Sequence, residues 1–241
     1  MRYAIISDIH GNLHSLELVL ADIQKTEVDQ IICLGDVASL GPKPNEVIAR
    51  LRELEIPTIM GNHDDYLLDL QLTENHHPWL RAMEKWAAEK LSEDDLDFLQ
   101  SFPPHLSFPL DDDTSMFCFH GSPRSNEEFL YPNVTPETLD EIFDGQDAKV
   151  LVGGHTHVQM IRQHGHMTFL NPGSVGMPFE FPTRGPEPMA LLRAEYAIVD
   201  MTDGKLTFDL YQLPIDFEHF SATAIASGMP EVDLWLSTWD T

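Results

Sequence analysis

Short apolar runs alternate with amphipathic stretches over the first 60 residues of the chain. Patterns typical of buried strands occupy residues 2–7, 31–34 and 58–60. Between them, apolar residues recur with helical spacing over about 13–25, and again from Pro44 to Leu54, where the proline suits a first helical turn. This β-α-β-α-β order predicts parallel strands joined by right-handed crossovers, and therefore an α/β protein.

The middle and end of the chain carry a helical stretch followed by many short strands. Residues 65–103 have mostly helical spacing, and we interpret them as a helical insertion that covers a site. A helix is expected from Pro136 to about Phe143, and Asp203-Gly204 predicts a hairpin turn. Further strands are expected at 105–110, 115–119, 149–153, 158–162, 166–170, 194–200 and 205–212. With no linker or repeat, residues 1–241 are expected to form one domain.

Composition excludes some classes of protein. The chain has 40 acidic and 14 basic side chains, which give a formal charge of −26. This charge argues against a nucleic-acid-binding surface, because phosphate backbones are held by Lys and Arg. No signal-peptide pattern or apolar run of membrane-spanning length is present, so we expect a cytoplasmic protein without membrane association. The two cysteines, Cys33 and Cys118, lie in apolar runs and are expected to be buried free thiols.

Side chains capable of binding metal follow five of the expected strands. These residues are Asp8 and His10, Asp36, Asn62 with His63, His120, and His155 with His157. In α/β folds, ligands bind in the loops at the carboxyl ends of the strands. A lone Asp-x-His triplet carries little weight in a chain this rich in Asp and His, but the ordered set at successive strand ends predicts one shared site.

The ordered motifs resemble those of the calcineurin-like metallophosphoesterase superfamily. They read Asp8-Ile9-His10, Gly35-Asp36, Gly61-Asn62-His63-Asp64, His120 and Gly154-His155-Thr156-His157. Flanking segments such as Asn171-Pro172-Gly173-Ser174-Val175-Gly176 are similar to a prokaryotic branch of small single-domain phosphoesterases. The resemblance implies a four-layer α/β/β/α sandwich, with two mixed sheets flanked by helices.

The resemblance also implies two divalent metal ions bridged by Asp36. Asp8, His10, Asp36 and His157 would hold one ion, and Asp36, Asn62, His120 and His155 the other. Mixed imidazole and carboxylate ligands suit Mn, Fe, Zn, Co or Ni, whereas an all-oxygen set would suit Mg or Ca. Two ions about 3.5–4 Å apart can activate a water molecule and clamp a phosphoryl group.

The activity implied is hydrolysis of a small phosphorylated substrate by metal-activated water. The substrate would be a phosphomonoester, a phosphodiester or a dinucleoside polyphosphate, with His63 as the general acid. Protein phosphatases of this superfamily orient that histidine with an Asp three residues after the bridging carboxylate, but this chain has Ser39 there, followed by Leu40 in place of the usual Arg. Asp64 and Asp65 are candidate partners of His63, or helix N-terminal charges.

Three residues are tentative substrate contacts. Asn12 would bind substrate or cap a helix, and Ser122 and Arg124 would meet the phosphate or form a turn around Pro123. Two other functions are weighed against hydrolysis at a metal centre. One is a non-catalytic, metal-binding interaction scaffold on the same fold, which usually accompanies loss of the ligands that this chain retains. The other is a serine hydrolase using Ser122 or Ser174, which lacks support because neither lies in a Gly-x-Ser-x-Gly motif.

Overall fold

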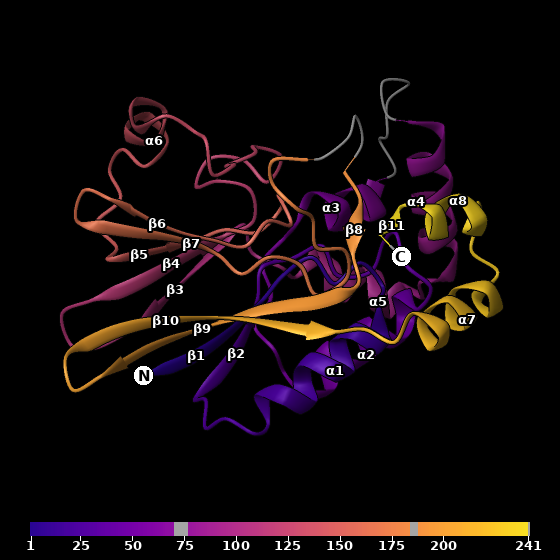
Figure 1. Ribbon diagram of the computed structural model, residues 1–241, viewed down its shortest axis with the longest axis horizontal. Helices are drawn as coiled ribbons and strands as arrows, with labels where there is room; N and C mark the ends of the chain where they lie inside the picture. Colours follow the sequence, from indigo (N-terminus) through magenta and orange to yellow (C-terminus); the bar gives the residue numbers. More distant parts are fainter. Residues whose placement is uncertain (70–76, 184–187, 241) are drawn as a thin grey trace.

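The computed structural model describes residues 1–69, 77–183 and 188–240, whose strands form two mixed sheets (Figure 1). The first sheet has the order β10-β9-β1-β2, with strands β1 (Arg2–Ile6), β2 (Gln30–Cys33), β9 (Arg193–Thr202) and β10 (Lys205–Pro214). The second has the order β3-β4-β5-β7-β6, with strands β3 (His105–Pro109), β4 (Ser115–Phe119), β5 (Val150–Val152), β6 (Met160–His164) and β7 (Met167–Asn171). Two short strands, β8 (Ala190–Leu191) and β11 (Trp239–Asp240), pair with each other.

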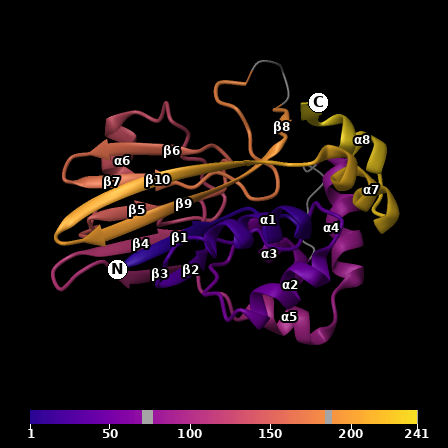
Figure 2. The ribbon, with the colours of Figure 1, turned by 60° about the horizontal axis from the view of Figure 1, so that its bottom comes forward.

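Helices cover the outer faces and one end of the sheets. In chain order they are α1 (Leu13–Ile23), α2 (Pro44–Glu53), α3 (Asn62–Asp69), α4 (Pro78–Lys90), α5 (Glu93–Gln100), α6 (Pro136–Ile142), α7 (Phe217–Ser227) and α8 (Val232–Ser237). Figure 2 shows α4, α5, α7 and α8 gathered at the end of the molecule opposite the β9–β10 hairpin. None of the helices in the described residues has the length and apolar character needed to cross a membrane.

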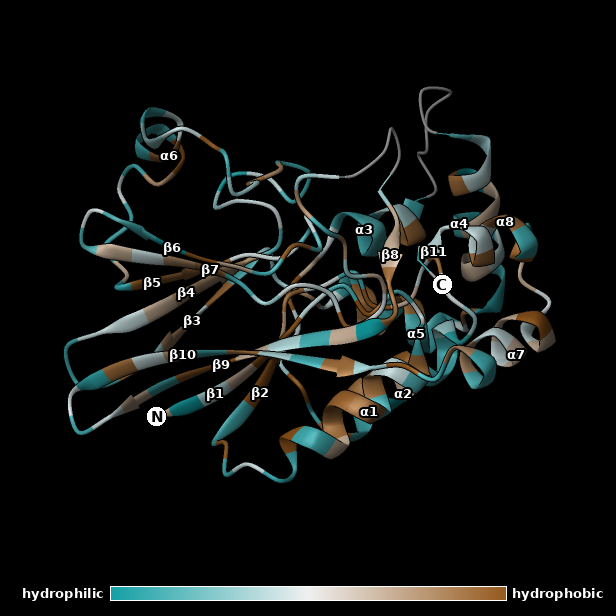
Figure 3. Cartoon of the chain, in the orientation of Figure 1, coloured by the Kyte–Doolittle hydropathy of each residue, from teal (hydrophilic) through white to brown (hydrophobic). Residues whose placement is uncertain are grey.

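Three hydrophobic cores separate four layers. The first lies between α1 and α2 and the outer face of β1, the second between the inner faces of the two sheets, and the third between the second sheet and α6. On β1, Ala4 and Ile6 face the helices while Tyr3 and Ile5 face the other sheet, so the strand is buried on both faces and reads as a continuous apolar run. The hydrophobic residues accordingly follow the strands through the middle of the molecule (Figure 3). This arrangement is the expected four-layer α/β/β/α sandwich.

Residues that the sequence marks as helix starts and as a turn lie at those positions in the structure. Pro44 lies in the first turn of α2, and the Thr135 side chain accepts a hydrogen bond from the Thr138 N–H at the start of α6. Asp203 and Gly204 both have positive φ, at 51° and 72°, in the turn between β9 and β10. Cys33 and Cys118 are buried free thiols.

The expected strand at residues 58–60 was wrong. In the structure, Thr58 forms one isolated bridge with Cys33. Pro57 has no N–H to extend the ladder, and the Met60 N–H donates to the Pro103 carbonyl instead of to a strand. The chain then turns directly into α3.

Two regions contain helices where residue patterns predicted none or only a general helical stretch. The segment 65–103 contains the end of α3 together with α4 and α5, while its residues 70–76 lie outside the described part. After β10, α7 and α8 pack through the rings of Phe220, Trp235 and Trp239, whose centroids are 4.6–5.4 Å apart. Tertiary packing therefore supports α8, which has only six residues.

Candidate metal centre

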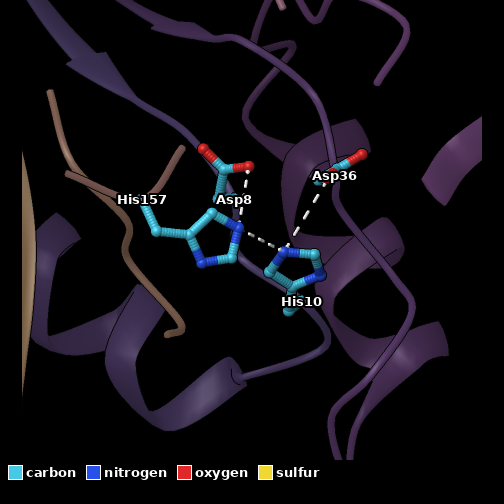
Figure 4. Close-up of side chains that lie close together, drawn as sticks. All are labelled: Asp8, His10, Asp36 and His157. Carbon is cyan, nitrogen blue, oxygen red and sulfur yellow. Dashed lines mark hydrogen bonds and ion pairs between the residues drawn. The ribbon is translucent and has the colours of Figure 1, made fainter. Parts of the chain in front are cut away.

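Loops at the carboxyl ends of the strands bring seven predicted ligands into one buried cluster. Asp8 and His10 follow β1, Asp36 follows β2, His120 follows β4, and His155 and His157 follow β5. Asn62 begins α3. Four of these side chains, Asp8, His10, Asp36 and His157, place one ligand atom each within 4.8 Å of one another, and Figure 4 shows His10 between His157 and Asp36.

A second group shares Asp36 with the first. Asp36, His120 and His155 also place ligand atoms within 4.8 Å of one another. The His120 Nε2 atom is 3.2 Å from Asp36 Oδ2 and 3.1 Å from Asn62 Oδ1, so the Asn62 amide lies beside this group. The two groups thus meet at the carboxylate of Asp36, the residue that the resemblance implies as the bridge.

The backbone at this centre is held in an unusual conformation. Asp8, His10, Asp36, His155 and His157 all have φ between 48° and 65°. This left-handed region is uncommon for residues with a side chain, although Asp and His tolerate it better than most. Such strain persists only where the surrounding structure holds it, and it is concentrated at functional sites.

Two glycines allow the ligand loops to approach each other. A Cβ atom at Gly61 would collide with the Asp36 carboxylate, and one at Gly154 would collide with the Ser7 hydroxyl and the Asp8 carboxylate. The glycines of the Gly-Asn-His-Asp and Gly-His-x-His motifs therefore leave room for the neighbouring carboxylates.

Backbone carbonyls fix the orientation of two candidate ligand rings. The His120 Nδ1–H donates to the Leu34 carbonyl at 2.8 Å, and the His157 Nδ1–H donates to the Met177 carbonyl at 2.6 Å. In both rings Nε2 is then left to face the cluster. This pattern is common for metal-binding histidines, because the second hydrogen bond sets the tautomer.

Charges within the cluster compete with burial. Burial opposes ionisation of Asp8, but His157 and His120 outweigh it and lower the pKa of Asp8 to about 2. Burial also opposes ionisation of Asp36, whose pKa is nevertheless held well below its usual value by His120 and His63. The carboxylates therefore remain ionised inside the protein, as metal ligands must be.

Several buried polar atoms at this centre fit a bound cation. Within the described residues, Asp8 Oδ1, Asp36 Oδ2 and His155 Nε2 are buried without a hydrogen-bond partner. The Nε2 atoms of His10 and His157 face each other at 3.1 Å. Leaving such atoms unpaired in the interior is costly, so the donor set suits divalent ions of the transition series.

Glu84 is the partner of His63, and residue patterns did not identify it. The His63 Nδ1 atom makes a short hydrogen bond with the Glu84 carboxylate, which projects from α4 and is fully buried. Burial lowers the pKa of His63, but the charges of Asp36 and Glu84 outweigh it and raise the pKa to about 9. Ser39, which stands where the protein phosphatases have Asp, is buried.

The two acids proposed beside His63 have other roles. Asp64 accepts backbone N–H groups of Asp36, Val37 and Gly61 at 2.8–3.1 Å, so it anchors the loop that carries Asp36. Asp65 is exposed. The Asp64 carboxylate thus fixes the backbone next to the candidate ligand Asp36. Glu84, rather than Asp64, makes the hydrogen bond with His63.

The tentative substrate residues lie at the edge of the centre. Asn12 is buried, does not cap α1 with its side chain, and donates to the Gly176 carbonyl at 3.0 Å. The Ser122 hydroxyl accepts the N–H groups of Arg124 and Ser125 in a turn. Arg124 is exposed and pairs with Glu128, although Ser122, Arg124 and His120 line one pocket together.

Side chains of the segment 171–177 form hydrogen bonds with the backbone of two ligand loops. The Asn171 amide donates to the Gly154 carbonyl at 2.7 Å, and the Ser174 hydroxyl donates to the Asp8 carbonyl at 2.7 Å. These bonds connect the loop after β1 with the loop after β5. The resemblance in the sequence marked this segment, and its contacts give it a structural role.

A pocket of about 450 Å³ is lined in part by residues of the candidate metal centre. Asp36, Asn62, His63, His155 and His157 form one part of its lining. The remaining lining residues come from other segments: Leu40, Tyr66, Trp79, Leu80, Glu127, Phe129, Met177 and Phe179. Its volume is in the range of small-molecule sites.

Comparison with known proteins connects this geometry to one family. Residues 1–203 match the profile of the calcineurin-like phosphoesterase superfamily domain. The phosphodiesterase YfcE of Escherichia coli K12 is 27% identical over 188 residues, which cover 74% of this chain and 81% of that protein.

Two further relatives match along nearly the whole chain. An uncharacterized protein of Methanocaldococcus jannaschii is 27% identical over 248 residues, covering 97% of this chain and 94% of that protein. The crystal structure of a metallophosphoesterase from Sphaerobacter thermophilus superposes with a TM-score of 0.75 at 28% identity, covering 99% of this chain and 98% of the other.

Proposed function

The chain belongs to the calcineurin-like phosphoesterase superfamily, and on that premise we propose that it hydrolyses a small phosphate ester with two divalent metal ions. The observation that carries the proposal is the pair of buried ligand groups that share Asp36, beside the buried His63–Glu84 pair. Both features line or adjoin one pocket of substrate size. The phosphodiesterase YfcE, a relative over most of this chain, supports an ester of phosphoric acid as the substrate.

In this proposal, Asp8, His10, Asp36 and His157 hold one ion, and Asp36, Asn62, His120 and His155 hold the other. Divalent ions at such a centre polarise phosphoryl oxygens and acidify a water molecule that serves as nucleophile. The positive charge of two divalent ions exceeds the negative charge of the Asp8 and Asp36 carboxylates, so the site carries a net positive charge. A phosphate group is therefore attracted there, although the protein as a whole carries a charge of −26.

His63 is the proposed general acid. Its Nδ1 atom is bonded to Glu84, so Nε2 is the ring nitrogen that can give a proton to the leaving oxygen. The Glu84 carboxylate orients the ring and stabilises its protonated form. The Asp36 carboxylate also accepts the backbone N–H of His63 at 2.9 Å, which ties the proposed acid to the bridging ligand.

Manganese, iron, zinc, cobalt and nickel all fit the mixed imidazole and carboxylate set. The proposed substrate is a small phosphorylated molecule, because 14 basic against 40 acidic side chains leave little positive surface for a nucleic acid. A cytoplasmic location is part of the same proposal.

Metal removal and reconstitution test the proposal. The purified protein is treated with EDTA, reloaded with each of the five metals, and assayed with p-nitrophenyl phosphate, bis-p-nitrophenyl phosphate and dinucleoside polyphosphates. We expect activity that is lost with EDTA and restored by at least one metal, with two equivalents of metal bound. Metal binding without hydrolysis of any ester would favour the interaction scaffold, and EDTA-resistant hydrolysis would contradict a metal-dependent reaction.

A further inference from the structure

Resting on the proposed function, we propose that the substrate is a phosphate ester with a single phosphoryl group whose organic part carries a flat aromatic ring, such as a nucleobase. Aromatic rings that are at least partly exposed lie against the candidate metal ligands on the wall of the pocket, and no Lys or Arg accompanies them among the described residues that line it. The scissile phosphoryl group would lie over the metal centre and the ring against these aromatic side chains.

Phe129 is the central ring of this wall. It stacks on the imidazole of His155 with ring centroids 4.1 Å apart and planes at 30°. It is also parallel to Tyr131, at 5.5 Å and 2°, and Tyr131 is in turn stacked on Phe181 at 5.3 Å and 15°. The larger separations belong to displaced stacks, which cover only part of each ring.

Phe129 keeps 52% of its surface exposed despite these contacts. A single exposed phenyl ring on a protein surface needs no functional explanation. This one lines a pocket that reaches the candidate metal ligands, and its partners continue the aromatic surface outward from His155. The exposed part of the ring therefore faces the space in which a substrate bound at the metal centre would extend.

A second ring lies over the other histidine of the same motif. Phe179 stacks on His157 with centroids 4.8 Å apart and planes at 8°, and it lines the same pocket while remaining partly exposed. Tyr66 and Trp79 add two more partly exposed aromatic side chains to the lining. Aromatic faces are favourable partners for flat rings, and stacking on them tolerates different bases.

The charges of the pocket distinguish esters with one phosphoryl group from polyphosphates, both of which the sequence allows as substrates. Among the described residues that line it there is no Lys or Arg, while Glu127 lies at its edge and accepts a hydrogen bond from the Tyr66 hydroxyl. Beyond His63, which is assigned to the leaving oxygen, a second phosphate next to the scissile one would meet no Lys or Arg among these residues, in a protein of net charge −26. The arrangement therefore disfavours polyphosphates and favours a neutral ring.

Matched substrates test this proposal. Adenosine 5′-monophosphate and methyl β-ribofuranoside 5-phosphate share the scissile ester bond and differ only in the group at C1′, and adenosine 5′-diphosphate adds one phosphate through a phosphoanhydride bond. For the metal-loaded protein we expect kcat/KM to be about 5- to 100-fold higher for the adenosine monophosphate than for the base-free ester, as for base stacking on aromatic side chains. We expect the diphosphate to be hydrolysed less efficiently than the monophosphate. Equal kcat/KM for the matched pair, or preference for the diphosphate, would overturn the proposal.

Variants connect the preference to the aromatic wall. Phe129→Leu keeps an apolar side chain but removes the ring, and the ratio of kcat/KM between the matched pair should fall toward 1. Phe129→Tyr restores the ring and should restore the ratio. Ile225→Ala, which trims an exposed apolar residue on α7, is the control and should leave the ratio unchanged. Metal content is measured for each, and an unchanged ratio in Phe129→Leu with full metal content would contradict the role of the ring.

Binding provides a readout independent of turnover. Calorimetry compares the methylene phosphonate analogue of adenosine 5′-monophosphate, in which carbon replaces the bridging oxygen, with the same analogue of the methyl riboside. We expect the adenosine compound to bind more tightly to wild type and to lose this advantage in Phe129→Leu. If no ester is hydrolysed but this difference persists, the proposed hydrolysis is wrong and the ring site stands. If esters are hydrolysed but the two analogues bind equally, the ring site is wrong and the hydrolysis stands.

Discussion

Glu84 of α4 makes a short hydrogen bond with His63 of α3, and the two residues are separated by 21 positions in the chain. The Glu84 carboxylate is fully buried, whereas His63 keeps a small exposed fraction on the wall of the pocket. A buried carboxylate facing an imidazole stabilises its protonated form. Helix α4, which lines the pocket with Trp79 and Leu80, therefore also supplies the partner of the proposed general acid.

Replacing Glu84 with Gln should weaken proton donation without removing the hydrogen-bonding side chain. We expect kcat for alkyl phosphate esters to fall about 10- to 100-fold, since a hydrogen bond to a charged group is worth about 1.5–3 kcal/mol. Rates for p-nitrophenyl esters should fall much less, because p-nitrophenolate leaves without a proton. Steady-state kinetics on both ester classes measure the difference.

A matched control for this variant lies on the same helix. Glu89→Gln changes an exposed acid of α4 that faces Lys85, and it should leave both rates unchanged. The double variant His63→Ala/Glu84→Gln should be no slower than His63→Ala, because Glu84 acts through His63. Additive losses would show that Glu84 acts by another route.

Replacing His63 with Ala tests the proton donor itself. General acids typically contribute about 10²–10⁴-fold, so alkyl phosphate esters should slow by that range while p-nitrophenyl esters slow far less. Metal content, measured by elemental analysis, should stay near that of wild type because Asn62 is the assigned ligand. Equal losses for both ester classes would contradict the general-acid role, and a lost metal ion would make His63 a ligand.

Asp36→Asn should lower metal content at both positions. One carboxylate serves both ligand groups, and an amide supplies only one neutral oxygen to ions that prefer a charged bridge. We expect most of the activity to be lost and less than two equivalents of metal to remain after dialysis. The bridge is contradicted if elemental analysis finds both ions fully retained.

Acid should release the metal ions before it unfolds the protein. Coordinating histidines must be neutral, so protons compete with the ions as pH falls toward the ordinary histidine pKa of about 6.5. The gap in Tm between metal-loaded and metal-free protein should therefore narrow from pH 8 to pH 5. A constant gap, with full metal retained at pH 4, would point to another cause of acid inactivation.

Glu195, whose N–H donates to the Ser174 carbonyl, predicts a pH dependence of stability. Burial raises its pKa to about 7 from 4.5, against the attraction of Arg193. Its favourable contribution is therefore complete below pH 4.5 and is lost as pH rises toward 7. Relative to wild type, Glu195→Gln should gain about 1–3 kcal/mol in unfolding free energy between pH 4.5 and pH 8.

Urea unfolding at several pH values measures this gain. Glu27→Gln, at an exposed loop position, serves as the control and should follow the wild-type curve. A constant difference between Glu195→Gln and wild type across this pH range would show that the Glu195 carboxylate ionises equally in the folded and unfolded chains.

Local patterns in the sequence are enough to predict which side chains gather at the candidate metal centre. Asp8, Asp36, His120 and His155 each lie a few residues after an apolar run that reads as a strand, and such runs share a carboxyl edge in an α/β fold. Their positions therefore follow from local patterns combined with one rule of topology. The glycines beside them, Gly61 and Gly154, belong to the same short motifs.

The residues that surround this centre are brought there by tertiary packing and could not be predicted from local patterns. Glu84 and Glu89 are two acids on one helix, and nothing in the local pattern separates the buried partner of His63 from the exposed partner of Lys85. Phe129 follows a polar turn without periodicity, yet it stacks on His155. Contacts between such segments depend on how whole elements pack, and side-chain packing is a property of the assembled core rather than of any local stretch.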